Sequence, residues 1–300
     1  MWRKNWRTRT ACLTQKLCKD MIHQPLISVI AAALNNERTI QRFIDSVSQQ
    51  TYPNIELIIK DGGSTDGTIE LLKRNNNRIT YWESKSDTGI YNAWNEALDH
   101  AKGEWIIFLG ADDYLWDSGV FEKLVSHLED VQQNIKIVYC QVAIVDKEGN
   151  KLGVAGEPWK RIKRKFSQIM CIPHPATVCR RSMFYAYGKF DESFHIAGDF
   201  EFLLRELKHA DAFFVPGLIL TAMQHGGVSS TPENHLDGLK EMRVILKKHG
   251  QKLPGIYWLM SYLRVMSRVL LLNLIGKKHV ASILDCGRSC TGKKPFWTRI

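Results

Sequence analysis

The stretch Trp105-Ile-Ile-Phe-Leu-Gly-Ala-Asp112-Asp113 decides the fold class of this chain. An apolar run of strand length ends in two adjacent carboxylates, each of which is costly to bury without a partner. Open α/β sheets bind ligands in the crevice at the carboxyl ends of their strands, and a divalent cation with a phosphorylated ligand would suit such carboxylates. A second acidic loop, Asp61–Gly67, follows another apolar strand at Ile55–Lys60. The two junctions predict a nucleotide-and-metal site.

Residues 26–128 alternate between strand and helix patterns. Apolar residues at Ile40, Phe43, Ile44 and Val47 have helical spacing, and we expect Asn35 or Asn36 to cap this helix. The expected strands are Leu26–Ala33, Ile55–Lys60, Ile79–Glu83 and Trp105–Leu109, and further helices are expected at Thr68–Lys73, 90–98 and 121–128. This order predicts an α/β fold in which a mostly parallel, nucleotide-binding sheet is flanked by helices.

The regular alternation ends after Ile135. The elements expected beyond it are a strand at Ile135–Val145 with a hairpin turn at Asp146–Asn150, a surface loop or short helix at Lys160–Lys165, a helix at Asp199–Lys208, strands at Ala212–Val215 and Leu218–Gln224, and a capping box at Ser230–Glu233. We therefore divide the chain into a basic tail at 1–24, one continuous body at 25–230 with halves at about 25–130 and 131–230, and C-terminal helices with a basic tail at 231–300.

The formal net charge of +10 is concentrated at the ends of the chain. The first nineteen residues carry six Lys or Arg residues and no acid. Basic ends of this kind favour binding to an anionic surface. On charge alone, nucleic acid and anionic lipid are both candidate partners. The seven cysteines contain no Cys-x-x-Cys pair, and no apolar segment of the signal-peptide kind precedes Pro25. We therefore expect reduced thiols and a cytoplasmic location.

The segment Ile256–Ile275 is mostly apolar but contains Arg264 and Arg268. Each arginine would cost roughly 2.5–3.5 kcal/mol at a bilayer centre even on the lenient insertion scale, so we do not expect a spanning helix. Two alternatives stay open with equal weight. The helix either lies in a membrane interface or packs within the protein.

Four motifs in order resemble one family. They are Ser28–Asn35, Lys60–Thr68, Ser86–Asn95 and Gly103–Asp113, each in a matching strand context. Together they resemble family 2 glycosyltransferases of the GT-A fold, and in particular bacterial enzymes of exopolysaccharide, lipopolysaccharide and colanic-acid assembly. The resemblance covers about Leu26 to Ser230. It implies transfer of a sugar from a nucleotide diphosphate to a hydroxyl acceptor, with inversion of the anomeric carbon.

The resemblance also implies roles for individual residues. The implied donor-binding residues are Ala33, Asn35, Asp61, Asp87 and Asp112. Among them, Asp61 is implied to form a hydrogen bond with the base of the donor. Asp112 and Asp113 match the Asp-x-Asp-type element, which grips the ribose and an Mg²⁺ or Mn²⁺ ion on the phosphates. Hard oxygen ligands suit these cations, which bind through few protein carboxylates plus phosphate oxygens.

Asp199 falls on the family's catalytic position, where a carboxylate takes the proton from the acceptor hydroxyl. A helix N-cap is its alternative role, and Glu201 is the fallback base, although it should point away from Asp199. His174 is a candidate contact of the acceptor or diphosphate, and its alternative is a structural histidine beside two prolines. His225 is a candidate third metal ligand, and its alternative is an ordinary loop histidine.

The chain departs from the family pattern in two places. Ala32–Asn35 replaces a common Pro-Thr-Tyr-Asn run, so a tyrosine is missing beside the base, and uridine, guanosine and thymidine donors all stay open. Gly110 and Ala111 stand where relatives often carry another acid or Asn, which leaves the metal to Asp112 and Asp113.

We expect a nucleotide-diphosphate sugar as donor, a glycan or lipid-linked acceptor, and a peripheral position on the inner face of the cytoplasmic membrane. A nucleotidyltransferase-like enzyme is one alternative, but neither phosphate-loop nor Gly-x-Gly-x-x-Gly motifs are present. A catalytically silent partner protein is another. No nucleic acid is expected as partner, since the basic ends contain no recognition motif.

Overall fold

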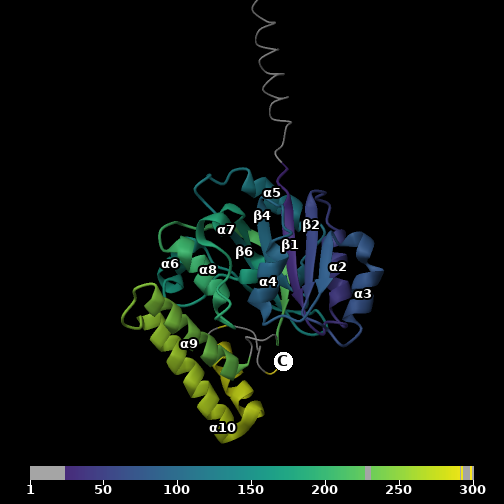
Figure 1. Ribbon diagram of the computed structural model, residues 1–300. Coiled ribbons are helices and arrows are strands. Elements are labelled where there is room, and N and C mark those ends of the chain that lie inside the picture. Colours follow the sequence, from purple (N-terminus) through teal and green to yellow (C-terminus); the bar gives the residue numbers. More distant parts are fainter. Residues whose placement is uncertain (1–23, 227–230, 291, 293–297, 299–300) are drawn as a thin grey trace, which may run out of the picture.

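The computed structural model describes residues 24–226, 231–290, 292 and 298. Its centre is a single nine-stranded sheet with the strand order β3-β2-β1-β4-β8-β6-β9-β5, and β7 pairs with β6 outside this path (Figure 1). Strands β1, β2, β3 and β4 are parallel to one another, whereas the remaining strands include antiparallel pairs. The predicted α/β class with a mostly parallel sheet is therefore confirmed.

The parallel half of the sheet consists of three largely apolar, buried strands, as expected for strands covered on both faces, and a half-buried edge strand. Its members are β1 (Ile27–Ala33), β2 (Ile55–Asp61), β3 (Tyr81–Ser84) and β4 (Trp105–Gly110). All four correspond to predicted strands, although β3 begins two residues later than expected. In this register Ala33 lies opposite Asp61, so the carboxyl ends of β1 and β2 meet at one edge.

The second half of the sheet is mixed. It contains β5 (Tyr114–Leu115), β6 (Ile137–Val145), β7 (Lys151–Ala155), β8 (Thr177–Arg180) and β9 (Phe213–Gln224). The prediction of two strands at Ala212–Val215 and Leu218–Gln224 was wrong. Pro216 and Gly217 do not end the strand, because the pairing of β6 with β9 continues across them with a shifted register and Gly217 adopts a positive φ of 77°.

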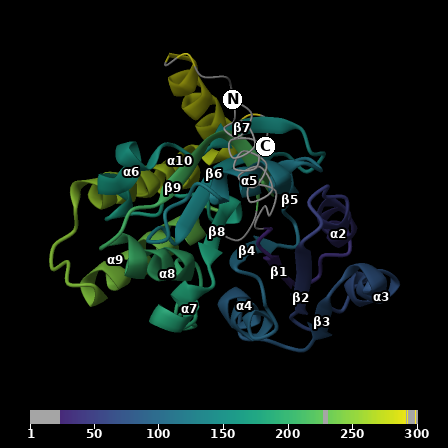
Figure 2. The ribbon, with the colours of Figure 1, turned by 90° about the horizontal axis from the view of Figure 1, so that it is seen from above.

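Helices cover both faces of the sheet (Figure 2). One face carries α2 (Ile40–Ser48), α3 (Thr68–Arg74) and α5 (Val120–Leu128). The other face carries α4 (Ile90–Leu98), α6 (Trp159–Phe166), α7 (Ser182–Tyr187) and α8 (Gly198–Leu207). The connections also contain two short 3₁₀ turns, η1 (Asn76–Arg78) and η2 (His174–Ala176). The expected asparagine cap of α2 was wrong. Thr39 precedes the helix, and the Asn36 side chain instead accepts the Leu34 N–H at 2.8 Å.

Two long helices follow the sheet and form a pair that extends from the body (Figure 1). They are α9 (Pro232–Lys248) and α10 (Ile256–Cys290), and α10 bends at Gly276, which has φ 76°. Thr231 caps α9 by accepting the Asn234 N–H, one residue later than the predicted capping box. The Trp258 indole N–H donates to the Leu239 carbonyl at 2.7 Å, which fixes α10 to α9.

The first turns of α10 leave an apolar stripe exposed. By length and composition Ile256–Gly276 could cross a membrane. Only 6% of its most apolar 18-residue stretch is buried within the protein. The face toward α9 is packed around Val265, whereas the opposite face exposes Ile256, Leu259, Met260, Leu263, Met266, Leu270 and Leu274. Packing within the protein therefore accounts for one face of this helix and leaves the other uncovered.

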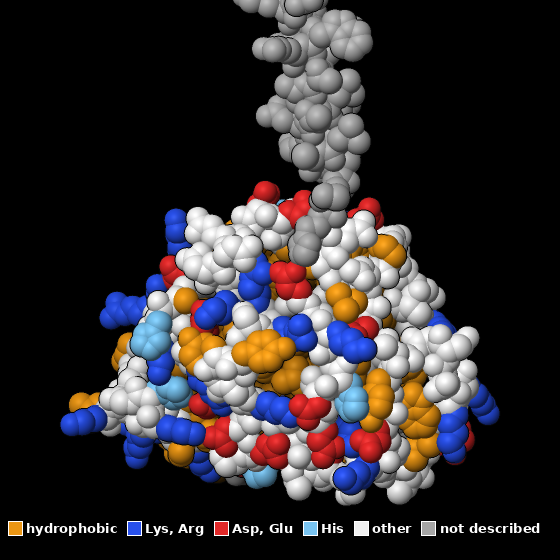
Figure 3. All heavy atoms as spheres, turned by 45° about the horizontal axis from the view of Figure 1, so that its top comes forward, with side chains coloured by type: hydrophobic (Ala, Val, Ile, Leu, Met, Phe, Trp, Pro, Cys, Tyr) orange, Lys and Arg blue, Asp and Glu red, His pale blue; other side chains and the backbone are white. Residues whose placement is uncertain are grey.

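The charges of the body are intermixed on the face drawn in Figure 3, where Lys and Arg side chains alternate with Asp and Glu. The predicted basic segment Lys160–Lys165 is part of helix α6. The predicted basic tail at 1–24 lies outside the described residues except for Gln24, and most of the C-terminal basic tail lies outside them too. The cysteines that the structure describes are free thiols.

Candidate active site

A cavity of about 490 Å³ opens at the carboxyl end of β4 and gathers four of the predicted site residues. Asp112 and Asp113 enter it from the turn after β4, His174 from η2, and Asp199 from the start of α8. Aromatic rings of Tyr91, Trp94 and Phe108 form another part of its wall. Three separate parts of the chain therefore converge on one space.

Asp113 is the more deeply buried member of the acidic pair. Its side chain is 7% exposed, and burial together with the neighbouring charge of Asp112 raises its pKa well above the usual value. The Arg42 guanidinium opposes this rise and also donates to the Asp112 carbonyl oxygen at 3.3 Å. Gly110 leaves room for the pair, since a Cβ there would lie 2.5 Å from Asp112 Oδ1.

The acidic pair fits a divalent cation. Two crowded carboxylates repel each other in a buried site, and a cation between them would relieve the repulsion. Among the described residues no group of three or more His, Cys, Asp and Glu side chains could hold a metal ion. A pair of carboxylates suits Mg²⁺ or Mn²⁺, which take one or two carboxylates and complete their shell with phosphate oxygens and water.

Asp199 lies at the second residue of α8, and Ala197 is the N-cap residue, so the N-cap alternative for Asp199 was wrong. Its Oδ1 accepts the Phe200 N–H at 2.7 Å. Burial raises the pKa of Asp199 to about 6, with a smaller contribution from Glu241, while Phe200 and the Tyr91 hydroxyl oppose the rise. A carboxylate with this pKa is ionised at neutral pH and basic enough to accept a proton.

Glu201 is occupied elsewhere. Its side chain is 2% exposed and forms an ion pair with Arg205 on the same helix, and His249 Nε2 lies 3.2 Å from its other oxygen. It is not among the residues that line the cavity that Asp199 faces. This geometry leaves Asp199 as the carboxylate of α8 that faces the cavity.

The two candidate histidines differ in their surroundings. His174 is 8% exposed, burial lowers its pKa to about 4, and its ring packs 5.2 Å from Trp94, so it is neutral and faces the cavity. His225 follows β9 and donates its backbone N–H to the Val145 carbonyl at 2.8 Å. Its pKa is lowered by burial and by Arg268 of α10. His225 is absent from the residues that line the cavity, whereas the preceding residue, Gln224, lines it.

The remaining donor-side candidates lie at the neighbouring ends of β1, β2 and β3. Asp61 is fully buried, and its oxygens accept the backbone N–H groups of Gly63 and Ser64 and the Ser84 hydroxyl at 2.6 Å. Asn35, with a positive φ of 54°, accepts the Thr65 N–H. In the described conformation these two side chains shape the loop after β2.

Ala33 and Asp87 complete this cluster. The Ala33 carbonyl accepts the Gly62 N–H at 2.8 Å. Asp87 accepts the Gly89 N–H at 3.0 Å and lies so close to Gly62 that a Cβ there would be 2.6 Å from Asp87 Oδ2. Burial raises the pKa of Asp87. These residues share the sheet edge with the acidic pair but do not line its cavity.

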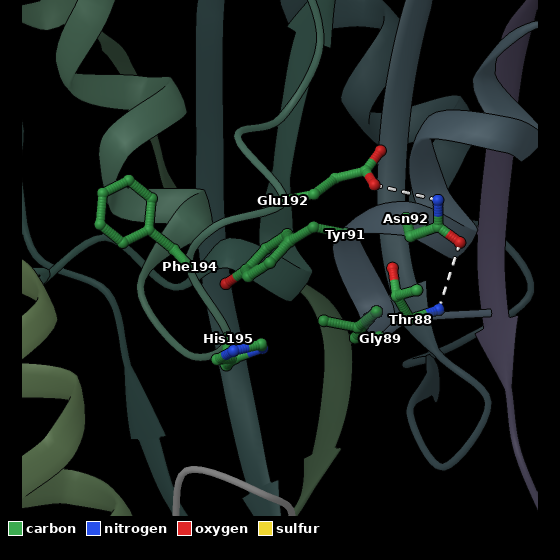
Figure 4. A pocket seen from close by; sticks show the side chains of 8 residues that line it. Thr88, Gly89, Tyr91, Asn92, Glu192, Phe194 and His195 are labelled. Atoms are coloured by element: carbon green, nitrogen blue, oxygen red, sulfur yellow. Dashed lines mark hydrogen bonds between the residues drawn. The ribbon is translucent and has the colours of Figure 1, made fainter.

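Contacts between α4 and the segment 190–197 escaped the sequence analysis. Asn95 is buried, accepts the Phe190 N–H and donates to the Phe190 carbonyl. The Asn92 side-chain amide donates to Glu192 Oε2 at 3.0 Å, and Figure 4 shows this pair beside Tyr91. No local pattern reveals such pairs, because their members are far apart in sequence.

A family profile described as glycosyl transferase family 2 matches residues 28–188, which is more than half of the chain. The chain belongs to this family. Its curated relatives include the "PGL/p-HBAD biosynthesis glycosyltransferase" of Mycobacterium tuberculosis, which is 28% identical over 69% of this chain and 80% of the relative. This membership makes the protein a glycosyltransferase.

Solved structures show the fold of the glycosyltransferase. S. aureus TarS 1-349 in complex with UDP-GlcNAc has a TM-score of 0.59 at 16% identity, over 83% of this chain and 76% of that one. A longer TarS chain is matched over 43% of its length. The mannosyltransferase PcManGT from Pyrobaculum calidifontis, in complex with GDP-Man and Mn²⁺, has a TM-score of 0.59 at 17% identity. The match covers 92% of this chain and 83% of that one. These likenesses confirm the predicted GT-A fold.

Proposed function

We propose that this glycosyltransferase is inverting and metal-dependent, and that it moves a sugar from a nucleotide diphosphate to a hydroxyl of a lipid-linked glycan in surface-polysaccharide biosynthesis. One observation carries the proposal: the acidic pair Asp112–Asp113 and the carboxylate of Asp199 face one cavity from different elements. The reaction needs both, because the leaving diphosphate requires neutralisation while the attacking hydroxyl must lose a proton. TarS with UDP-GlcNAc and PcManGT with GDP-Man and Mn²⁺ support the donor class.

In this mechanism Asp113 and Asp112 would hold the cation, and Asp199 accepts the proton of the acceptor hydroxyl. The acceptor oxygen forms its bond to the anomeric carbon as the bond to the diphosphate oxygen breaks, so attack from the opposite side inverts that carbon. A bound Mg²⁺ or Mn²⁺ supplies Lewis-acid stabilisation of the departing diphosphate. His174 is neutral and offers a hydrogen bond without adding charge.

The donor nucleotide is proposed to lie along the carboxyl ends of β1 and β2, over Ala33, Asn35 and Asp87. Asp61 shapes the loop that would face the base. A direct contact between Asp61 and the base requires the exchange of one of its present hydrogen bonds. The wall of the cavity beyond the acidic pair is largely apolar, with Val142, Ile172 and Met223, which suits an acceptor that carries an apolar group.

Calorimetric titration with UDP, GDP and dTDP, each with and without Mn²⁺, tests the donor proposal. We expect one diphosphate to bind only when Mn²⁺ is present, because the phosphates complete the metal shell. The matching nucleoside monophosphate is the control, and it should bind weakly and without metal dependence. Absence of binding by all three diphosphates would contradict the proposal and favour a catalytically silent partner protein.

Membrane association is the second part of the proposal, and the exposed stripe of α10 supports it. Helical spacing places Leu263 and Leu270 on this stripe, at 58% and 59% exposure, and exposed Arg264 borders it. Arg268 is turned toward His225 and His235 on the protein side. A helix with one apolar face and a basic border lies in the interface of an anionic membrane. The acceptor would then be reached at the inner face of the cytoplasmic membrane.

Substitution of both Leu263 and Leu270 by Gln should reduce cosedimentation with phosphatidylcholine–phosphatidylglycerol vesicles. Each lost leucine contact is worth about 1.5–3 kcal/mol when fully buried, so the combined loss should exceed about tenfold in affinity. Tyr185→Gln is the control, since Tyr185 is 76% exposed on α7, outside the helical pair. Unchanged sedimentation of the double variant would contradict membrane docking through this stripe.

A further inference from the structure

Glu241 on α9 binds the backbone that leads into the catalytic helix α8. One carboxylate oxygen accepts the His195 N–H at 2.9 Å, and the other accepts the N–H groups of Ile196 at 2.9 Å and Ala197 at 2.7 Å. Three consecutive backbone donors thus converge on one side chain from another helix. Asp199 lies two residues beyond the last of them.

These donors need a partner from outside their own segment. The N–H groups at the start of a helix have no acceptor within it, and a capping side chain normally supplies one. The N-cap residue of α8 is Ala197, whose side chain has no acceptor. Glu241 therefore supplies the acceptor for the N-cap residue Ala197 and for the two residues before it, and hydrogen bonds to a charged acceptor are the stronger ones.

The face of α9 that carries Glu241 is shaped to reach this segment. Gly238 lies one turn earlier, and a Cβ there would be 3.1 Å from Ile196 Cγ2, so its absence lets the helix approach closely. Lys248 lies two turns later and binds Asp191 Oδ2 at 2.7 Å. Residues at these spacings share one helix face. The segment 191–197 is thus held at both ends by α9.

The opposite side of the segment rests on α4. The Tyr91 hydroxyl donates to the Ile196 carbonyl at 2.9 Å. Gly198 packs flat on the Tyr91 ring, since a Cβ there would be 2.7 Å from a ring carbon. The backbone before Asp199 therefore has a fixed path between two helices. Figure 4 shows Tyr91 of α4 and His195 of this segment around the small pocket that both line.

We propose that Glu241 is a positioning residue for the catalytic base, and that α9 is part of the active site. This inference rests on the proposed role of Asp199. Loss of the carboxylate frees three backbone donors and loosens the start of α8. Misplacement of a reacting group by about 1 Å costs about 10²-fold in rate.

The charge of Glu241 also acts on Asp199 directly. Burial is the main cause of the raised pKa of Asp199, and the negative charge of Glu241 adds to it. The other titratable groups that face Asp199 or share its cavity are Tyr91 from α4, Cys171 from the segment before η2, His174 from η2, His195 from the preceding segment, and Asp112 and Asp113 from the turn after β4. Removal of the Glu241 charge should therefore lower the pKa of Asp199.

Glu241→Gln and Glu241→Ala, compared with Asp237→Asn, test the inference. Asp237 lies one turn earlier on α9, and its exposed side chain pairs with Lys240, so its variant removes the same charge without touching segment 195–197. We expect kcat to fall about tenfold in Glu241→Gln, which keeps one acceptor oxygen, and about 10²-fold in Glu241→Ala, with donor KM nearly unchanged. The acid limb of the pH profile should move to lower pH in both.

Hydrogen exchange supplies a readout apart from activity. The amides of residues 195–197 should exchange faster in both Glu241 variants, and those of Asp237→Asn should match the parent protein. Suppose that Glu241→Ala has the kcat, the acid limb of the pH profile and the amide protection of the parent protein, while Asp199→Asn is inactive. The inference about Glu241 is then overturned and the base assignment stands. If Asp199→Asn is active, the base assignment itself fails.

Discussion

Asp199→Asn is expected to reduce kcat by about 10²–10⁴-fold, the usual contribution of general acid–base catalysis. An amide has the size of the carboxylate but cannot accept the proton of the acceptor hydroxyl. The cavity, the acidic pair and the hydrogen bond from the Phe200 N–H to the side-chain oxygen can all remain. Binding of the donor diphosphate with Mn²⁺ should therefore be unchanged, which calorimetry measures beside the rate assay.

The pH dependence of the parent enzyme gives a second measure of this role. The pKa of Asp199 is raised to about 6, so the base is protonated below that pH and ionised above it. Turnover should fall about tenfold per pH unit below this midpoint, and the limb should be absent from the residual activity of Asp199→Asn.

The stability of Asp199→Asn should not fall at neutral pH. A carboxyl group with a raised pKa in the folded state stabilises the fold fully only below its unfolded pKa, and this contribution is lost as pH rises through about 6. A melting temperature equal to or above that of the parent is the expected result. Near-normal turnover in a folded Asp199→Asn variant would show that another group is the base.

Asp113→Ala is expected to abolish transfer for a different reason. It removes the buried carboxylate of the acidic pair, and a metal's stabilisation of charge in the transition state is worth several kcal/mol, or about 10³-fold in kcat/KM. Unlike Asp199→Asn, it should also remove the Mn²⁺ dependence of diphosphate binding. The two variants thus separate the metal site from the base.

Asp117→Ala is the matched control for Asp113→Ala. Asp117 lies four residues later, but its side chain is exposed and pairs with Lys123 at the surface. Such a pair contributes about 0–1 kcal/mol, so the control should keep both activity and Mn²⁺-dependent binding. Retention of Mn²⁺-dependent binding by Asp113→Ala would contradict the assignment of the metal to this pair.

The part of the site that follows the parallel strands could be predicted from sequence. Strand β2 ends in Asp61 and strand β4 is followed by Asp112 and Asp113, and the pattern of burial along a strand is a local property. Parallel strands end at the same edge, so their terminal residues must lie near one another. The order of the motifs then indicated the family, which the family profile confirmed over residues 28–188.

The acceptor half could be predicted only in outline. Asp199 was chosen by resemblance, but its place opposite the acidic pair depends on how α8 packs across the sheet. The division of β9 into two strands was wrong because Pro216 and Gly217 interrupt a strand locally, whereas the pairing with β6 tolerates a shifted register. Asn36 was expected to cap α2, but its side chain turns back to Leu34 instead.

By itself, the sequence determined the fold class, the family and the edge of the sheet at which the chemistry lies, because these follow from periodicity and motif order within short windows. The tertiary structure alone decided which side chains share a cavity, that the charge of Arg268 acts on His225, and that Glu241 binds the backbone before α8. The physical reason is that a hydrogen bond between distant segments requires only a donor and an acceptor at the right separation. The packing of α4, α8 and α9 sets that separation, and no spacing along the chain records it.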